Sequence, residues 1–461
     1  MAARLIESLA TTEAFAELFS DASVLQAMLD FEVGLARAEA RVGIVPESAA
    51  DAIAAAATPE AFDAARLAQD GLLAGALPIP FVKALTERVR ARDSAAAGFV
   101  HWGATSQDVA DTALVLLLKR ARPVLESDLP RLQNALTRLG ETHANSVMLG
   151  RTLLQAAPPI TFGLKAAGWF SAIERCRARV ASTFDEALIV QLGGATGTLA
   201  SLGGHGTAVT HALAEELQLG FPEAPWHTQR DRLAALMCAC GVLTGALGKM
   251  ARDVSLLMQT EIAEVAEPLG PGRGGSSTMP HKRNPSGCVV ALAAATRAPH
   301  LVASFLFGMV QEHERAAGSW QAEWPTVAAL MQATGAAAAS MAEVAEGLTV
   351  DPARMRANLD ATLGAVFAER AMMLLGAKLG RDVAHKLLDD ATRKSVSQKR
   401  HLTEVLSEMP EVTRHMDSAT LKKLEVPEEY LGSADAFRRG LLGTVKATRK
   451  NTRKDAAKEK E

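Results

Sequence analysis

Residues 233–257 read LAALMCACGVLTGALGKMARDVSLL, and their pattern decides the fold class. The apolar residues recur at alternating steps of three and four, which places them along one side of an α-helix and is typical of a heptad seam. The seam consists of Leu233, Leu236, Cys240, Leu243, Leu247, Met250, Val254 and Leu257. Between Pro225 and Pro268 the pattern predicts a helix of about forty residues, roughly 60 Å long at 1.5 Å per residue. Such a helix needs partners along its length, including other subunits.

The apolar run from Leu233 to Gly248 within this helix is shorter than the ~20 residues that a bilayer requires, and Arg232 and Lys249 flank it. We therefore expect a buried bundle helix and no membrane partner. The N-terminal sequence MAARLIESLATTEAFAELF carries acidic and polar residues where a signal peptide needs an apolar core. A cytoplasmic location follows as an expectation.

The composition of the 461-residue chain agrees with a helical protein, because only 4% of its residues are aromatic and Tyr430 is its single tyrosine. A formal net charge of −3 gives no electrostatic reason to expect nucleic acid as a partner. The cysteines lack the paired spacing of a zinc site or disulfide framework, and we interpret them as small core residues. They are Cys176, Cys238, Cys240 and Cys288.

Two further helical stretches are predicted, one from Ile160 to about Leu188 and one from Gly287 towards Leu348. The second contains Pro299 and Pro325, where we expect a kink or break because proline lacks the amide donor. Residues 191–206, QLGGATGTLASLGGHG, predict a loop, either a plain connector or a close backbone approach. The loop lacks the G-x-G-x-x-G pattern of a dinucleotide site.

These patterns predict an all-α chain with four parts. Residues 1–111 form an N-terminal helical domain, and residues 112–355 form a central bundle of long helices with a loop at 270–287. Residues 356–444 form a C-terminal helical domain. Residues 445–461 are charged and almost free of apolar side chains, which is typical of a disordered tail.

The loop at 270–287 reads GPGRGGSSTMPHKRNPSG and is the most informative segment for chemistry. Its five glycines and three prolines exclude a regular helix. The hydroxyls of Ser276, Ser277 and Thr278, with Lys282 and Arg283 close behind, would surround an anion with donors and positive charge. A P-loop is disfavoured, because Gly275 is followed by serine where that motif has lysine.

Three short segments resemble motifs of the fumarase/aspartase superfamily. They are GSSTMPHKRNP at 275–285, HWGATSQD at 101–108 and RTLLQAAPP at 151–159. The resemblance implies a three-domain, all-α subunit whose long helices form the twenty-helix core of a homotetramer. It also implies that segments from three subunits build each active site, with neither a metal nor an organic cofactor.

The resemblance also implies roles for single residues. Ser277 matches the residue that transfers the proton, with His281 or water as alternatives, and Lys282 could lower the pKa of its hydroxyl. Lys282 and Asn284 match positions that hold a substrate carboxylate, and Ser276 adds a hydroxyl beside them. The other polar binding positions are matched by His101, Thr105, Ser106, Arg151, Thr152 and Gln155.

Two departures distinguish members of the superfamily. Leu153 and Leu154 stand where many of its lyases have a catalytic histidine, and no tyrosine precedes Tyr430 to join a nucleotide-phosphate site. Residues 225–232, 311–324 and 427–432 resemble segments of the bacterial 3-carboxymuconate cycloisomerases. That family converts 3-carboxy-cis,cis-muconate to 4-carboxymuconolactone in protocatechuate (β-ketoadipate) catabolism.

A tricarboxylate substrate needs cations, and Arg151, Lys282 and Arg315 lie in or beside the matching segments, with Arg230 a weaker candidate. For Arg315 the alternative is a helical ion pair with Glu312 or Glu314. Two other functions remain open at this point. They are an adenylosuccinate lyase or related fumarate-releasing lyase, and a structural protein without activity.

Overall fold

The computed structural model describes residues 5–270, 272–275, 278–279 and 281–443. The chain forms two compact units. Unit 1 consists of Met1–Pro130, Arg175–Gly248 and Val289–Met341, and unit 2 of Arg131–Glu174, Lys249–Cys288 and Ala342–Glu461. The boundaries between the units fall inside the long helices. The division into three domains stays a prediction, and the predicted tail at 445–461 lies outside the described residues.

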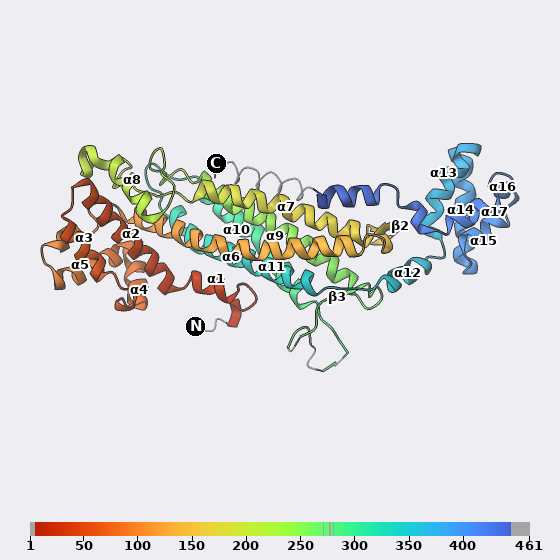
Figure 1. Cartoon of the computed structure of the whole chain (residues 1–461), viewed down its shortest axis with the longest axis horizontal. Helices are drawn as coiled ribbons and strands as arrows, with labels where there is room; N and C mark the ends of the chain where they lie inside the picture. Colours follow the sequence, from red (N-terminus) through yellow and green to blue (C-terminus); the bar gives the residue numbers. More distant parts are fainter. Residues whose placement is uncertain (1–4, 271, 276–277, 280, 444–461) are drawn as a thin grey trace, which may run out of the picture. The chain divides into compact units, whose positions relative to one another are not determined.

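The long helices are α6 (Ser106–Thr142), α7 (Phe162–Ala187), α9 (Asp231–Leu257), α10 (Ser286–Gly308) and α11 (Ser319–Gly347). The shorter helices before α9 are α1 (Glu13–Leu18), α2 (Asp21–Val42), α3 (Glu47–Ala56), α4 (Ala64–Ala74), α5 (Pro78–Arg92) and α8 (Gly206–Leu217). Those after α11 are α12 (Pro352–Asp360), α13 (Ala368–Leu379), α14 (Arg381–Gln398), α15 (Leu402–Ser407), α16 (Pro410–Thr413) and α17 (Ser418–Leu424). Figure 1 follows these helices along the chain.

The predicted all-α class is confirmed, with two small antiparallel sheets added. The first pairs β1 (Val147–Thr152) with β2 (Gln155–Thr161), and the second pairs β3 (Val265–Ala266) with β4 (Thr349–Val350). Short 3-10 turns complete the described elements. They are η1 (Leu5–Glu7), η2 (Pro59–Ala61), η3 (Ala96–Phe99), η4 (Ala200–His205), η5 (Ala365–Phe367) and η6 (Pro427–Tyr430).

The seam predicted at 233–257 is confirmed, because every one of its residues is buried. Burying a leucine side chain stabilises the fold by about 1.5–3 kcal/mol, so the seam makes α9 a core helix. The predicted length of about forty residues is wrong, since α9 has 27 residues. Before α9, Gln191 accepts a hydrogen bond from the Trp226 amide at 2.8 Å, and after it Ala263 takes a positive φ of 50°. The hydrogen bond before α9 and the left-handed backbone after it keep both flanking segments out of the helix.

Of the kink or break predicted at Pro299 and Pro325, the break is wrong, because both prolines lie inside helices α10 and α11. The kink stays a prediction. Proline keeps a helical φ and removes one hydrogen bond, a loss of about 3 kcal/mol that packing of a long apolar helix offsets. The chain breaks instead at residues 309–318, and Gly318 there has a φ of 102°. The helix predicted from Ile160 to Leu188 is confirmed as α7, with ends shifted by one or two residues.

Helices α9 and α10 are long and apolar enough to cross a membrane by length and composition alone. In α9, 61% of the most apolar window is buried within the chain, as expected for a core helix, whereas in α10 the share is 22%. The exposed apolar side chains of α10 include Val289, Leu306 and Phe307. The absence of a membrane partner stays a prediction.

Candidate active site

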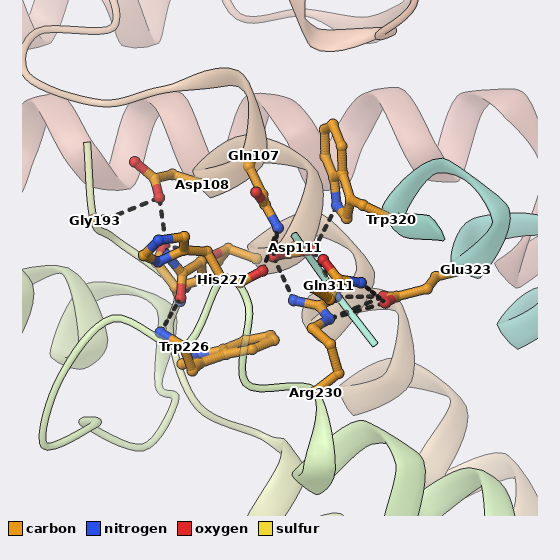
Figure 2. Close-up of polar contacts among 12 residues, drawn as sticks. Gln107, Asp108, Asp111, Gly193, Trp226, His227, Arg230, Gln311, Trp320 and Glu323 are labelled. Carbon is orange, nitrogen blue, oxygen red and sulfur yellow. Dashed lines mark hydrogen bonds and ion pairs between the residues drawn. The ribbon is translucent and has the colours of Figure 1, made fainter. Parts of the chain in front are cut away.

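The carboxylate of Asp108 organises the start of α6 in unit 1. It accepts hydrogen bonds from the amides of Thr105, Gly193 and Gly194 at 3.0, 2.9 and 2.9 Å, and from the side-chain amide of Gln191 at 3.1 Å. Burial raises the pKa of Asp108 to about 6, and these four donors oppose that rise. The four donors favour the ionised form of Asp108, and the carboxylate ties residues 101–108 to the glycine-rich loop at 191–206 (Figure 2).

Glycine is required where these two segments meet. Gly103 has a φ of 72°, and a Cβ there would lie 2.4 Å from the side chain of Leu202. Gly194 has a φ of 66°, and a Cβ there would lie 3.0 Å from the carbonyl oxygen of Gly103. Both positions combine a left-handed backbone with a close approach that a larger residue would prevent. The loop predicted at 191–206 is thus confirmed, with the short turn η4 inside it.

Gln107 lies one residue before Asp108 in α6 and is buried as well. Its side chain binds Arg315 close to Asp108. Its amide nitrogen donates to the His227 carbonyl at 2.7 Å and to Asp111 at 3.1 Å, while its oxygen accepts from Arg315 Nε at 3.1 Å. Arg315 also donates to the carbonyl of Ala195 at 3.2 Å. Among the described residues, the acceptors around this exposed guanidinium are all neutral amides. Arg315 therefore keeps its positive charge available to an anion.

The alternative interpretation of Arg315, a helical ion pair, does not occur within the described part of the chain. Residue 315 lies in the non-helical segment 309–318, where its backbone amide donates to the Glu312 carbonyl at 3.2 Å. The guanidinium reaches away from Glu312 and Glu314 to the start of α6 and the glycine-rich loop.

Arg230 occupies a different environment in the same unit. Its side chain is wholly buried and donates to Asp111 at 2.7 and 2.9 Å and to Glu323 at 3.0 Å. The indole of Trp320 adds a hydrogen bond to Asp111 at 3.1 Å (Figure 2). Burial raises the pKa of Glu323 to about 7, against the lowering effect of Arg230. Asp111 and Glu323 compensate the charge of Arg230 inside the protein, so we interpret Arg230 as a structural residue.

The remaining predicted residues of unit 1 lie on the segment that leads into α6. His101 has a φ of 58°, and its Nδ1 lies 2.7 Å from a carboxylate oxygen of Glu32 in α2. Thr105 and Ser106 are half-buried, and neither hydroxyl makes a hydrogen bond within the residues that the structure describes. Unit 1 thus brings together His101, Thr105, Ser106 and Arg315 around residues 107 and 108.

In unit 2, the hairpin of β1 and β2 holds the second motif. Leu153 and Leu154 form its two-residue loop with φ values of 51° and 66°, the backbone signature of a type I′ turn. Thr152 and Gln155 flank this tip as an exposed cross-strand pair. The Arg151 guanidinium lies against buried Glu264, with hydrogen bonds of 3.0 and 2.7 Å. Its charge is therefore already paired.

The signature loop of unit 2 is described in part. The predicted residues Ser276 and Ser277 lie outside the described residues. Lys282 is exposed, and its ammonium has no partner within the described ranges. The backbone amide of Asn284 donates to the Gly274 carbonyl at 2.8 Å, and its side chain donates to Gly275 at 3.4 Å. Lys282 therefore keeps its charge available.

The loop is anchored where it enters α10. The buried carboxylate of Glu267 accepts the amide hydrogens of Gly287 and Cys288 at 3.0 and 2.8 Å. These are unpaired donors of the first helical turn, so Glu267 caps the helix and its charge is stabilised by the helix dipole. The end of the loop that carries Lys282 and Asn284 is thereby fixed to the body of unit 2.

Sequence reasoning missed Asp108, Gln107 and Glu32. Thr105 and Asp108 are spaced three residues apart at a helix start, as in a capping box, and that signal marks Asp108. Glu32 interrupts an apolar helical face, which is the signal of a buried acid. Among the described residues, no group of three or more His, Cys, Asp or Glu side chains is placed to hold a metal ion. The cofactor-free site stays a prediction.

Comparison with known families identifies the chain. Residues 8–299 match the lyase family, and residues 364–439 match the adenylosuccinate lyase C-terminus. The chain belongs to the lyase family. The predicted membership of the fumarase/aspartase superfamily, and the likeness to its bacterial 3-carboxymuconate cycloisomerases, are confirmed.

Three relatives of this lyase are informative. A 3-carboxy-cis,cis-muconate cycloisomerase of Bradyrhizobium diazoefficiens is 47% identical over 441 residues, 96% of this chain and 98% of that protein. The crystal structure of the 3-carboxy-cis,cis-muconate lactonizing enzyme from Pseudomonas putida has a TM-score of 0.89 at 45% identity, covering 96% and 98% of the two chains. A nitrosuccinate lyase of Streptomyces davaonensis is 45% identical over 423 residues, 90% and 89% of the two chains.

Proposed function

We propose that this lyase is a 3-carboxy-cis,cis-muconate cycloisomerase that forms 4-carboxymuconolactone. One substrate carboxylate adds to the conjugated double bond, and a proton is delivered to the carbon beside another carboxylate, so the reaction is an isomerisation. The observation that carries the proposal is the identity of 47% with a curated enzyme of that name across 96% of this chain.

The chemistry of the site supports this reaction. The attacking carboxylate is already ionised and tethered to the acceptor, so proximity supplies much of the rate and no general base has to activate it. An exposed leucine pair, Leu153 and Leu154, at the hairpin tip is therefore compatible with turnover. Negative charge that develops on the second carboxylate needs fixed donors. Arg315, held by neutral acceptors, is the cation of unit 1 that we assign to a substrate carboxylate.

The motif residues complete the proposal. We assign proton transfer to Ser277 with support from Lys282, and carboxylate binding to Lys282, Asn284 and Ser276. The further binding residues of the proposal are His101, Thr105, Ser106, Arg151, Thr152 and Gln155. Arg151 is the weakest cation of the set, because Glu264 already neutralises it.

The proposal includes a homotetramer whose subunits share active sites, acting on a small polycarboxylate in the cytoplasm. The exposed side chains of Val289, Leu306 and Phe307 on α10 support association, since burial of exposed apolar side chains against another subunit is favourable. The names of the relatives, which are metabolic enzymes, support the location.

A direct assay tests the proposal. Purified protein of tetrameric mass is mixed with 3-carboxy-cis,cis-muconate, and the loss of its conjugated ultraviolet absorbance is followed while the lactone is identified by NMR. We expect rapid bleaching that depends on enzyme concentration. An unchanged spectrum from a folded, tetrameric sample would overturn the proposal.

A second candidate is a fumarate-releasing lyase, because the relative from Streptomyces davaonensis is named a nitrosuccinate lyase at 45% identity. Adenylosuccinate lyase belongs to the same class, although no tyrosine precedes Tyr430. Fumarate release from nitrosuccinate and from adenylosuccinate should be measured with the same sample. A value of kcat/KM for either substrate above that for 3-carboxy-cis,cis-muconate would select elimination instead.

A further inference from the structure

Helix α2 carries two acidic residues into the core of unit 1. Glu32 and Glu39 are 1% and 0% exposed, and they lie on the same helix face as the buried apolar residues Met28 and Leu35. The two acids are seven residues apart, two helical turns, so both point into the same layer of side chains. Burial of an ionised carboxylate is costly unless a partner compensates its charge. Each acid therefore needs either a partner that compensates its charge or a pKa high enough to keep it neutral.

The partners of these acids differ sharply. Glu32 Oε1 lies 2.7 Å from His101 Nδ1, whereas Glu32 Oε2 and both oxygens of Glu39 are buried without a hydrogen-bond partner among the described residues. Burial, with a further contribution from Glu32, raises the pKa of Glu39 to about 9. Glu39 is thus a neutral acid at pH 7, whereas Glu32 has a basic partner, His101, that can compensate a negative charge.

His101 is the natural counterion of that charge. Burial lowers the pKa of His101, but the charge and hydrogen bond of Glu32, together with the charge of Asp108 in α6, outweigh it and the net shift is upward. These two carboxylates are the charged groups that act on the imidazole. The His101 side chain is 15% exposed, and its Nδ1 faces the buried acid.

The backbone of His101 supports a functional placement. Its φ of 58° lies in the left-handed region, which is strained for a residue other than glycine. The strain persists because Asp108 fixes the following turn, through the amide of Thr105, to the glycine-rich loop. The imidazole is therefore held between a fixed backbone and a fixed acid.

We propose that Glu32 is a positioning residue that keeps His101 protonated, with Nδ1–H directed to Glu32 and Nε2–H presented to a substrate carboxylate. Glu39, two helical turns after Glu32 on α2, is neutral and adds no competing charge. The role of Nε2–H rests on the proposed function, because it requires an anionic substrate at this site. The charge state of His101 does not depend on the proposed function, and it can be measured on the substrate-free protein.

The first experiment is a histidine side-chain NMR titration of the ligand-free protein, with the His101 signal assigned from His101→Gln. We expect His101 to be protonated at pH 7 in the wild type and to titrate at a lower pH in Glu32→Gln. Glu39→Gln is the matched control, since it replaces a neutral acid by a neutral amide and should leave the titration unchanged. A neutral His101 at pH 7 in the wild type would overturn the proposal, even if Glu32→Gln did not fold.

The second experiment follows turnover of 3-carboxy-cis,cis-muconate between pH 6 and pH 8.5. Loss of a charge-assisted hydrogen bond should raise KM for Glu32→Gln roughly 10- to 100-fold at pH 8. The loss should shrink towards pH 6, where the unassisted imidazole regains its proton. An equal loss at every pH would indicate a purely structural role. Since the NMR titration needs no substrate, failure of the proposed function and failure of this inference give separate results.

Discussion

Arg230 and Arg315 both lie in segments that resemble the cycloisomerases, and both reach the first turns of α6, but their surroundings differ. Arg230 is buried between Asp111 and Glu323, whereas Arg315 is exposed and bound by the Gln107 side chain and backbone carbonyls. Carboxylates neutralise a guanidinium, and neutral acceptors orient it while leaving its charge available. The partners of an arginine, more than its presence in a motif, decide whether it can bind an anion.

The same distinction applies in unit 2. Arg151 is paired with buried Glu264, while Lys282 has no partner among the residues that the structure describes. Each unit therefore contains one neutralised cation beside a predicted binding segment and one that remains available. Within the proposed function, Arg315 and Lys282 are the two cations that we expect to contact substrate.

We expect the largest loss of stability when the buried Arg230 is replaced. Arg230→Met leaves Asp111 and Glu323 buried without their counterion, which should reduce the free energy of unfolding by about 3–5 kcal/mol. Denaturant unfolding measures it. As a control, adding Asp111→Asn and Glu323→Gln to Arg230→Met should recover part of the loss, because no buried charge remains. Unchanged stability of Arg230→Met would contradict the structural role.

Arg315→Gln should reverse the pattern. We expect kcat/KM for 3-carboxy-cis,cis-muconate to fall roughly 100- to 1000-fold, equivalent to ~2.7–4 kcal/mol, because one preorganised donor to the developing charge is lost. The Tm should stay near that of the wild type, since the side chain is exposed. Arg315→Lys is the matched control. It keeps the charge without the planar fork and should show an intermediate loss. Full activity of Arg315→Gln would exclude it from the site.

Glu39 differs from Asp111 and Glu323, because it is a buried acid with no counterion among the residues that the structure describes. Its pKa is about 9 in the fold against 4.5 in the unfolded chain, so between these values the folded protein binds more protons. Stability is therefore full below about pH 4.5 as far as this group is concerned, and it falls as the pH rises towards 9, by at most ~1.4 kcal/mol per pH unit. Glu39→Gln should remove this slope.

Thermal unfolding at pH 6 and pH 8.5 checks the prediction for Glu39. The Tm difference between Glu39→Gln and the wild type should move in favour of the variant at the higher pH. Glu32→Gln serves as the comparison, because it removes a buried acid that has a hydrogen-bond partner, His101. A wild-type Tm whose pH dependence is unaltered by Glu39→Gln would show that this acid is not the source of the slope.

The smallest effect is expected at the hairpin tip. Leu153→Asn with Leu154→Gly places residues that favour positive φ at both loop positions and should relieve ~1–2 kcal/mol of backbone strain per residue at most. We expect a rise of a few degrees in Tm, measured by calorimetry. If the leucines contact substrate, kcat/KM falls while Tm rises. A lower Tm would show that the leucine side chains are themselves stabilising contacts.

Much of this could be predicted from the sequence because the signals are local. The seam at 233–257 follows from helical spacing, and the three motifs follow from short segments. The ends of α9 could not be predicted, since Gln191 fixes Trp226 from a distant part of the chain. For the same reason the sequence alone could not predict the different environments of Arg230 and Arg315. Their partners, such as Asp111 and Gln107, lie more than a hundred residues away.

We propose that this lyase binds a substrate carboxylate through Arg315, whereas Arg230 supports the fold. The most direct measurement is the steady-state kcat/KM for 3-carboxy-cis,cis-muconate of the wild type, Arg315→Gln and Arg230→Met, each with its Tm recorded on the same sample. We predict an active wild type, an Arg315→Gln whose kcat/KM is roughly 100- to 1000-fold lower at an unchanged Tm, and an Arg230→Met with a strongly lowered Tm. An active Arg315→Gln, or an Arg230→Met that keeps its Tm and loses turnover, would contradict it.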